Sequence, residues 1–228
     1  MHICGLQKTT LLDYPGKVAC TVFLGGCNFR CPFCQNSEIL SAASPAAYTE
    51  EELFAFLQKR RGILEGVCVS GGEPLLHEEA EGLLKKIKAF GYCVKVDTNG
   101  SFPARLKKLC AAGLVDFVAM DIKNSPAKYA QTCGAAVELA AVRESAAFLL
   151  EGGVDYEFRT TVADELHTEE DMEEIGAWLA GAKRFYLQNF RDAETVLCPG
   201  LHPCSEKKLQ AFRAVLRRTI PEAKIRGE

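Results

Sequence analysis

The 228-residue sequence lacks several features that would place the protein in a common class. It contains no run of about 18 apolar residues, so we expect no membrane-spanning helix. The segment from Met1 to Gly5 has neither the basic stretch nor the long apolar stretch of a secretory signal. The formal net charge is -3, which argues against wholesale binding of nucleic acid. These absences favour a cytoplasmic protein that binds neither membranes nor nucleic acid.

Motifs for hydrolysis and for phosphate binding are also missing. The sequence has no Walker loop, no HExxH motif and no convincing Ser-His-Asp set. Its four histidines are scattered, and we expect them at the surface. There is neither an internal repeat nor a low-complexity tract, and 48% of the residues are apolar, which is enough for a substantial core. One large α/β domain is the simplest organisation for this length.

Cysteine, by contrast, is plentiful. The chain has 11 cysteines, and Cys27, Cys31 and Cys34 lie close together in a Cys-x3-Cys-x2-Cys pattern. In a reducing cytoplasm, clustered thiols bind metal more often than they pair with each other. A structural zinc site normally has four protein ligands, whereas three thiolates can hold an iron–sulfur cluster and leave one iron open. The pattern therefore favours a catalytic cluster.

Two other interpretations of these cysteines remain open. Cys31 and Cys34 alone could form a dithiol of the thioredoxin type, which would leave the first cysteine unused. Alternatively, the three thiols could form a zinc site completed by His2, Cys198 or Cys204. The first alternative predicts redox chemistry, and the second predicts a structural or interaction module.

Short β-type segments alternate with helical ones along the chain. The predicted strands are residues 18–24, 67–70, 93–97, 117–122, 155–162 and 184–188. A capping box at 49–52 predicts a first helix, and further helices are expected over about 77–90, 103–112, 135–150, 168–179 and 205–219. Repeated βα units imply a parallel sheet, and active sites gather at the carboxyl ends of such strands. The cysteine loop and several polar clusters follow strands in this way.

Three motifs carry a resemblance to a known family. They are the segment KTTLLDYPGK from Lys8 to Lys17, the cysteine loop with Phe33 before its last cysteine, and the Gly-Gly-Glu-Pro sequence that begins at Gly71. Together they resemble the radical S-adenosylmethionine (radical SAM) superfamily, and more narrowly the activating proteins of anaerobic ribonucleoside-triphosphate reductase. The resemblance is strongest over residues 5–125 and extends as a barrel to about residue 190.

The resemblance implies a fold and a chemistry. The fold is a partial, open (β/α)6 barrel with a parallel sheet, in a single domain with its core over about 16–190 and a C-terminal helical extension over about 191–228. Cys27, Cys31 and Cys34 would hold a [4Fe–4S] cluster whose fourth iron chelates S-adenosylmethionine. Reductive cleavage would give methionine and a 5′-deoxyadenosyl radical, which takes a hydrogen atom from a glycine Cα of a partner protein. Flavodoxin or ferredoxin would supply the electron.

The same resemblance assigns residues around S-adenosylmethionine. A carbonyl at Gly71 or Gly72 would accept from the methionine ammonium, with Glu73 assisting. Alternatively, this sequence is only a tight strand-to-helix turn, and Glu73 holds the loop. Phe33 would lie near the adenine, or else fill space in the core. The Gln188-Asn189 pair stands where some relatives have a histidine near the adenosine.

Charged and polar residues after two later strands complete the expected site. Asp97 and Asp121 would share a monovalent cation, and Thr98 and Asn99 would bind the ribose or that cation. Asn99 could instead form an Asx turn with the following glycine. The methionine carboxylate would pair with Lys123 or Arg159. Alternatively, these two side chains only neutralise the aspartates.

Two alternative functions compete with glycine activation. One is a radical SAM enzyme that acts on a small molecule, similar to the 7-carboxy-7-deazaguanine synthases. The other, from a different class, is a zinc-binding interaction module. Cys198 and Cys204 are too few for a second cluster, and the chain has no appended ferredoxin-like cysteine run.

Overall fold

The computed structural model describes residues 1–227, which form two compact units. The first unit comprises Met1–Asn28, Glu38–Thr98 and Phe102–Val118. The second comprises Phe29–Ser37, Asn99–Ser101 and the chain from Ala119 onward. The chain therefore passes from one unit to the other within the cysteine loop, around the Asn99–Ser101 turn and inside one strand, β5 (Phe117–Asp121).

The first unit is built on four hydrogen-bonded strands. β1 (Ile3–Thr10) pairs antiparallel with β2 (Ala19–Leu24), and β2, β3 (Gly66–Gly71) and β4 (Cys93–Thr98) pair in parallel. Five of the six side chains of β2 are buried. A strand that reads as an almost continuous apolar run is typical of a parallel sheet covered on both faces.

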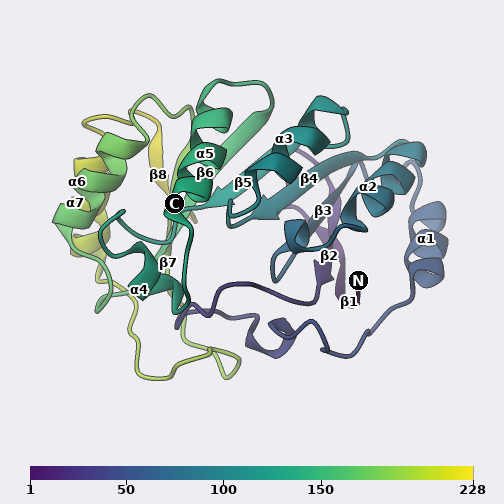
Figure 1. The fold of residues 1–228 in the computed structure, drawn as a ribbon, viewed down its shortest axis with the longest axis horizontal. Helices are drawn as coiled ribbons and strands as arrows, with labels where there is room; N and C mark the ends of the chain where they lie inside the picture. Colours follow the sequence, from purple (N-terminus) through teal and green to yellow (C-terminus); the bar gives the residue numbers. More distant parts are fainter. Residues whose placement is uncertain (228) are drawn as a thin grey trace. The chain divides into compact units, whose positions relative to one another are not determined.

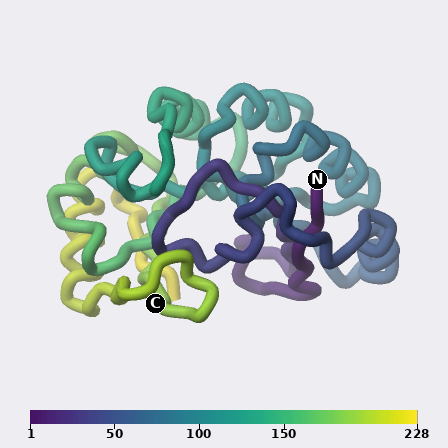
Figure 2. The backbone as a smooth tube through the Cα atoms, turned by 60° about the horizontal axis from the view of Figure 1, so that its bottom comes forward, coloured from purple at the N-terminus to yellow at the C-terminus, as the bar shows by residue number. Residues whose placement is uncertain are grey.

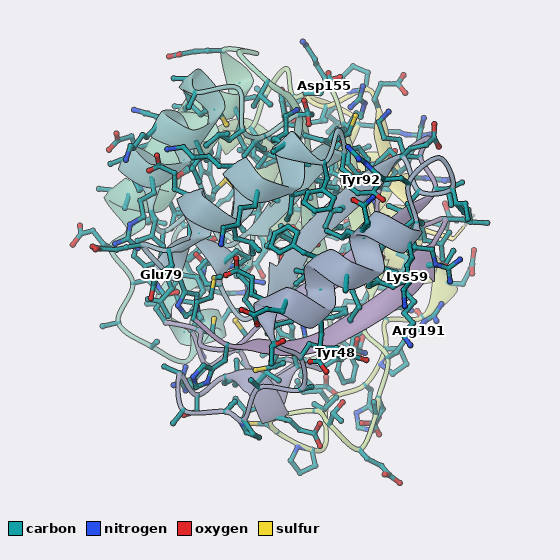
Figure 3. All side chains as sticks on the ribbon, turned by 90° about the vertical axis from the view of Figure 1, so that its right-hand side faces the viewer. Tyr48, Lys59, Glu79, Tyr92, Asp155 and Arg191 are labelled. Carbon is teal, nitrogen blue, oxygen red and sulfur yellow. The ribbon has the colours of Figure 1, made fainter. Side chains whose placement is uncertain are left out.

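Helices α1 (Glu50–Lys59), α2 (Ala80–Ala89) and α3 (Pro103–Ala111) connect these strands, and a 3-10 turn, η2 (Pro74–Leu76), precedes α2. Figure 1 shows the three helices along the strands of this unit. The predicted capping box is confirmed, because Thr49 and Glu52 exchange hydrogen bonds at the start of α1. The hydroxyl of Tyr92 donates to the Leu57 carbonyl at 2.7 Å, which anchors the end of α1 near the exposed Lys59 (Figure 3).

The second unit contains the last residues of β5 and three further strands. β6 (Asp155–Val162), β7 (Phe185–Asn189) and β8 (Ala223–Ile225) pair in parallel. Helices α4 (Tyr129–Cys133), α5 (Leu139–Leu150), α6 (Glu169–Trp178) and α7 (Glu206–Leu216) accompany them, and α6 and α7 lie side by side (Figure 1). Phe158, Phe185 and Phe212 are fully buried and form part of the core of this unit.

The predicted strands and main helices are present, with several differences. The helix expected from residue 135 begins at Leu139, and the one expected to reach residue 219 ends at Leu216. β1 is not among the predicted strands, because residues 7–9 are exposed and the strand shows no apolar alternation. β8 has three residues and α4 has five, too few to give a periodic signal. The helix expected from residue 77 begins at Ala80, because the preceding proline starts the η2 turn. Within residues 1–227, no helix combines the length and the apolarity needed to cross a bilayer.

Candidate functional site

In the first unit, the Gly-Gly-Glu-Pro turn lies directly against the backbone that leads into Cys27. The Gly72 amide donates to the Leu24 carbonyl at 2.9 Å, and the Glu73 amide donates to the Gly26 carbonyl at 2.8 Å. A Cβ atom on Gly72 would lie 2.0 Å from the Gly26 oxygen and 3.2 Å from the Cβ of Cys27. Only glycine allows the two backbones to approach this closely.

Glu73 holds this turn in place rather than reaching outward. Its side chain is fully buried. One carboxylate oxygen accepts from the Leu75 amide at 3.0 Å and from the Thr98 hydroxyl at 2.8 Å. Glu73 therefore caps η2 and ties it to the end of β4, which agrees with the alternative that it supports the loop.

At the end of β4, Asp97 is paired with a buried lysine. The Lys95 ammonium donates to one carboxylate oxygen of Asp97, and the Ser70 hydroxyl donates to the other at 3.1 Å. The Lys95 side chain is 0% exposed, whereas that of Asp97 is 14% exposed. Lys95 was not among the predicted site residues. A lysine in an otherwise apolar strand, two residues before a candidate ligand, nevertheless indicates an ion pair with that ligand.

In the second unit, the rest of the cysteine loop is held by backbone hydrogen bonds. The Arg30 amide donates to the Cys133 carbonyl at 2.8 Å, at the C-terminal end of α4. The Cys198 amide donates to the Pro32 carbonyl at 3.0 Å, and the Leu197 amide donates to the Cys34 carbonyl at 3.1 Å. Figure 2 shows this yellow-green segment running beside the dark purple loop. These contacts fix the path of the loop and give the exposed Cys198 a backbone role.

Of Cys31 and Cys34, Cys31 is the thiol that is more ready to bind metal. It is 6% exposed. A hydrogen bond with the Cys133 side chain lowers the pKa of Cys31, burial raises it, and the positive charge of Lys123 lowers it again, with a net value of about 7. Burial raises the pKa of Cys34. At neutral pH a large share of Cys31 is therefore thiolate, which is the form that ligates metals.

Asp121, Lys123 and Arg159 form an ion-paired group next to the loop. The Arg159 Nε donates to one Asp121 oxygen at 2.9 Å, and the Lys123 ammonium donates to the other at 3.1 Å. The Lys123 ammonium also lies 5.9 Å from the centre of the Phe33 ring. Burial lowers the pKa of Lys123, but Asp121 and Cys31 raise it to a value above that of a free lysine. Lys123 is therefore a permanent cation beside the cysteine loop.

Three other residues named in the sequence analysis form hydrogen bonds within the fold. Asn99 accepts from the Ser101 amide at 3.0 Å and from its hydroxyl at 2.6 Å, as in the alternative Asx turn. The side-chain amide of Asn189 donates to the Cys204 carbonyl and accepts from the Cys204 amide, both at 2.9 Å. His2 contacts the Ser44 carbonyl at 2.8 Å. Among residues 1–227, no group of three or more His, Cys, Asp or Glu side chains surrounds a position for a single metal ion.

One histidine departs from the sequence-based expectation. His167 was expected at the surface and is 0% exposed. Its ring contacts the Lys123 carbonyl at 3.0 Å and accepts from the Ala163 amide at 3.2 Å. The ring is buried because it lies between the backbone that follows β6 and the segment that carries Lys123, and its two hydrogen bonds join them.

Two kinds of known protein are similar to this chain in sequence. A Methanocaldococcus jannaschii protein, provisionally named a glycyl-radical enzyme activating enzyme, is 27% identical over 98% of this chain and 95% of its own length. The 7-carboxy-7-deazaguanine synthase of Halobacterium salinarum is 37% identical, but only over 40% of this chain and 36% of the synthase.

Solved structures share the fold. A domain of the pyruvate-formate lyase-activating enzyme from Bacteroides vulgatus matches with a TM-score of 0.58 and 21% identity, covering 71% of this chain and 99% of that domain. SuiB from Streptococcus suis, bound to S-adenosylmethionine, matches with a TM-score of 0.70 and 13% identity over 91% of this chain and 52% of SuiB. The predicted partial (β/α) barrel is confirmed. The Radical SAM superfamily model matches residues 21–179, so this chain belongs to the radical SAM superfamily.

Proposed function

We propose that the chain is a glycyl-radical activating enzyme, and that its partner is an anaerobic ribonucleoside-triphosphate reductase. The observation that carries the proposal is the extent of similarity. The activating-enzyme relative aligns over nearly the full length of both chains, whereas the 7-carboxy-7-deazaguanine synthase aligns over little more than a third of its length. The segment from Lys8 to Lys17 supports the reductase as partner, because it is part of the resemblance to that group of activases.

Membership in the superfamily implies a [4Fe–4S] cluster and S-adenosylmethionine. We assign the cluster to Cys27, Cys31 and Cys34. The donor set fits a thiolate-bound cluster, because a hydrogen bond with Cys133, and then the charge of Lys123, lower the pKa of Cys31 to about 7. When bound and reduced by flavodoxin or ferredoxin, the cluster supplies the electron that cleaves the carbon–sulfur bond of S-adenosylmethionine.

The protein side of the mechanism is binding and orientation. Gly72 lets its turn pack against the backbone that leads into Cys27, and Thr98 lies at the end of the adjoining strand. Lys123 would bind the methionine carboxylate with the donors that Asp121 does not use, while Arg159 holds Asp121 in place. In the overall reaction, one S-adenosylmethionine, one electron and one glycine hydrogen atom would be consumed, and methionine, 5′-deoxyadenosine and a glycyl radical on the partner would be formed.

Two further assignments complete the binding site. Phe33 packs beside Lys123 and would form one wall of the adenine site. Gly71, Glu73 and Asn99 would shape the loops of the site: Glu73 is bonded to the Leu75 amide and the Thr98 hydroxyl, and Asn99 to Ser101. We assign no monovalent cation to Asp97 and Asp121, because both carboxylates are already paired with side-chain cations.

The decisive experiment is anaerobic reconstitution with iron and sulfide, followed by reduction in the presence of S-adenosylmethionine and the reductase. We expect about four irons per chain, release of 5′-deoxyadenosine, and a glycyl-radical signal on the reductase in electron paramagnetic resonance. Turnover of a free nucleobase precursor without a protein partner would instead identify a synthase. One zinc per chain without sulfide would refute the radical mechanism.

Cysteine variants locate the cluster. Cys31→Ala is expected to lose the cluster and all cleavage of S-adenosylmethionine, because two thiolates cannot hold it in the same way. Cys198→Ala is the matched control, since Cys198 is exposed and belongs to the same unit. Retained cleavage in Cys31→Ala, or a halved iron content in Cys198→Ala, would contradict the assignment.

A further inference from the structure

Lys95 is a buried charge that the proposed mechanism does not use. Its side chain is 0% exposed and lies in β4 between the buried Val94 and Val96. A charge removed from water is stable only when a partner of opposite sign and hydrogen bonds compensate for its lost hydration. Lys95 has such partners in Asp97 and, at 3.7 Å, the sulfur of Cys68.

The strand register explains why these groups meet. Residues two apart in a strand face the same side, so Lys95 and Asp97 share one face of β4. Cys68 of β3 is the direct parallel partner of Lys95, and Ser70 follows on the same face of β3. The Ser70 hydroxyl donates to Asp97 at 3.1 Å, and the Cys68 sulfur lies 3.6 Å from the other oxygen of Asp97. The four side chains form one polar group inside the first unit.

This group disagrees with the expectation that Asp97 and Asp121 bind a monovalent cation. Both carboxylate oxygens of Asp97 receive donors from the chain itself, and one donor is a full positive charge. In the second unit, Asp121 likewise receives Arg159 on one oxygen and Lys123 on the other. A metal ion at either carboxylate would have to displace an ammonium or a guanidinium that is already in contact.

We propose that Lys95 is a positioning residue whose ammonium group supplies a positive charge at Asp97, in the place that a monovalent metal ion would take. The inference rests on the proposed function, in which the end of β4 contributes to binding S-adenosylmethionine. The fixed charge holds Asp97 and the start of the Thr98-Asn99 turn in one arrangement whether or not a salt is present. Binding of S-adenosylmethionine is therefore independent of added potassium or sodium.

The test compares potassium with tetramethylammonium, a cation too large to fit at the partly buried Asp97 carboxylate, at equal ionic strength. The first measurement is the thermal midpoint of the cluster-free protein, and the second is the dissociation constant of S-adenosylmethionine for the anaerobically reconstituted protein. For the wild-type chain, both quantities are expected to be the same in the two salts, with less than about a twofold change in affinity, because ionic screening is matched.

Lys95→Met is expected to create a cation requirement. Its affinity for S-adenosylmethionine should fall at least roughly tenfold in tetramethylammonium, because Asp97 is left with an uncompensated charge, and potassium or ammonium should restore it. The thermal midpoint of the cluster-free variant should rise in potassium. The double variant K95M/D97N should lose this response, since it has no charge left to neutralise. Lys85→Met removes a solvent-exposed ion pair with Glu81 and is the matched control.

The outcomes separate this inference from the proposed function. A wild-type chain that requires potassium for either measurement would overturn the role of Lys95, and so would a Lys95→Met variant that shows no salt response. Because the wild-type comparison needs no variant, it decides the question even if Lys95→Met does not fold. A protein that binds no S-adenosylmethionine in either salt would refute the proposed function, and the thermal midpoints of the cluster-free protein would still decide the charge assignment.

Discussion

Replacing Gly72 with alanine tests the closest backbone approach in the candidate site. The added Cβ would lie 2.0 Å from the Gly26 oxygen and 2.6 Å from the Gly26 carbonyl carbon. Real Cβ atoms are essentially never found within 3.0 Å of a non-bonded atom, so the two backbones must separate by about 1 Å. The hydrogen bond from the Glu73 amide to the same oxygen would be strained or broken.

The expected magnitudes follow from this displacement. Forcing an extra methyl into a packed site typically costs about 1–3 kcal/mol of folding stability. The larger effect is on function, because a displacement of about 1 Å at a binding group can lower a rate by about a hundredfold. Gly72→Ala is therefore expected to fold while losing most of its affinity for S-adenosylmethionine and most of its cleavage rate.

Gly82→Ala is the matched control. Gly82 lies in α2 of the same unit, and a Cβ there would meet no atom within 4 Å. Alanine in a helix is more favourable than glycine by about 0.5–1 kcal/mol, so this variant is expected to be slightly more stable and fully active. The assay is equilibrium binding of S-adenosylmethionine and release of 5′-deoxyadenosine after anaerobic reconstitution. If Gly72→Ala binds and cleaves like Gly82→Ala, the close-approach argument is refuted.

Three further predictions concern the second unit. Gly134→Ala is expected to lower the free energy of unfolding by about 2–4 kcal/mol. Gly134 ends α4 at φ +58°, and a Cβ there would lie 2.3 Å from a carbonyl oxygen of the cysteine loop. An unchanged thermal midpoint would contradict this prediction. Burial raises the pKa of Asp171, but Lys128 and other donors lower it below its usual value. Asp171→Asn should therefore lower the free energy of unfolding by about 2 kcal/mol at neutral pH. The loss should become smaller as the pH falls through the native pKa of Asp171, because protonation removes the same charge in the wild-type chain. A urea titration at several pH values measures this, and an equal cost at all of them would refute it. In cluster-free protein, alkylation of Cys31 should reach half its maximal rate near pH 7, while Cys34 needs a more alkaline solution; equal profiles by mass spectrometry would count against the thiolate assignment.

The sequence was most informative where function depends on local patterns. The spacing of the three cysteines and the Gly-Gly-Glu-Pro turn pointed to the family, and family membership is confirmed by the match over residues 21–179. The assignments of individual residues to the cluster and to S-adenosylmethionine stay predictions. Glu73 and Asn99 illustrate why: the same oxygen that can bind a ligand can also cap a turn, and only the fold shows which partners it has.

Long-range contacts could not be predicted from the sequence. Cys133 interacts with Cys31 although about a hundred positions separate them, and nothing in the short α4 segment indicates that it ends at the cysteine loop. Lys95 is a different case, because its placement follows from the strand period alone. A lysine facing the same side as Asp97 could have been identified as its partner once residues 93–97 were predicted to be a strand.

Two ionisable groups, Lys123 and His167, have pKa values that are shifted away from neutral pH, which bears on the proposed chemistry. Lys123 keeps its proton far above neutral pH, because Asp121 and Cys31 stabilise its charge. His167, which touches the Lys123 carbonyl, is held neutral because burial lowers its pKa. General acid–base catalysis works best with groups whose pKa lies near the operating pH, and these two groups have been moved away from it in opposite directions. Such an arrangement suits a site that binds a charged cofactor and orients it, while the reaction itself transfers a hydrogen atom rather than a proton.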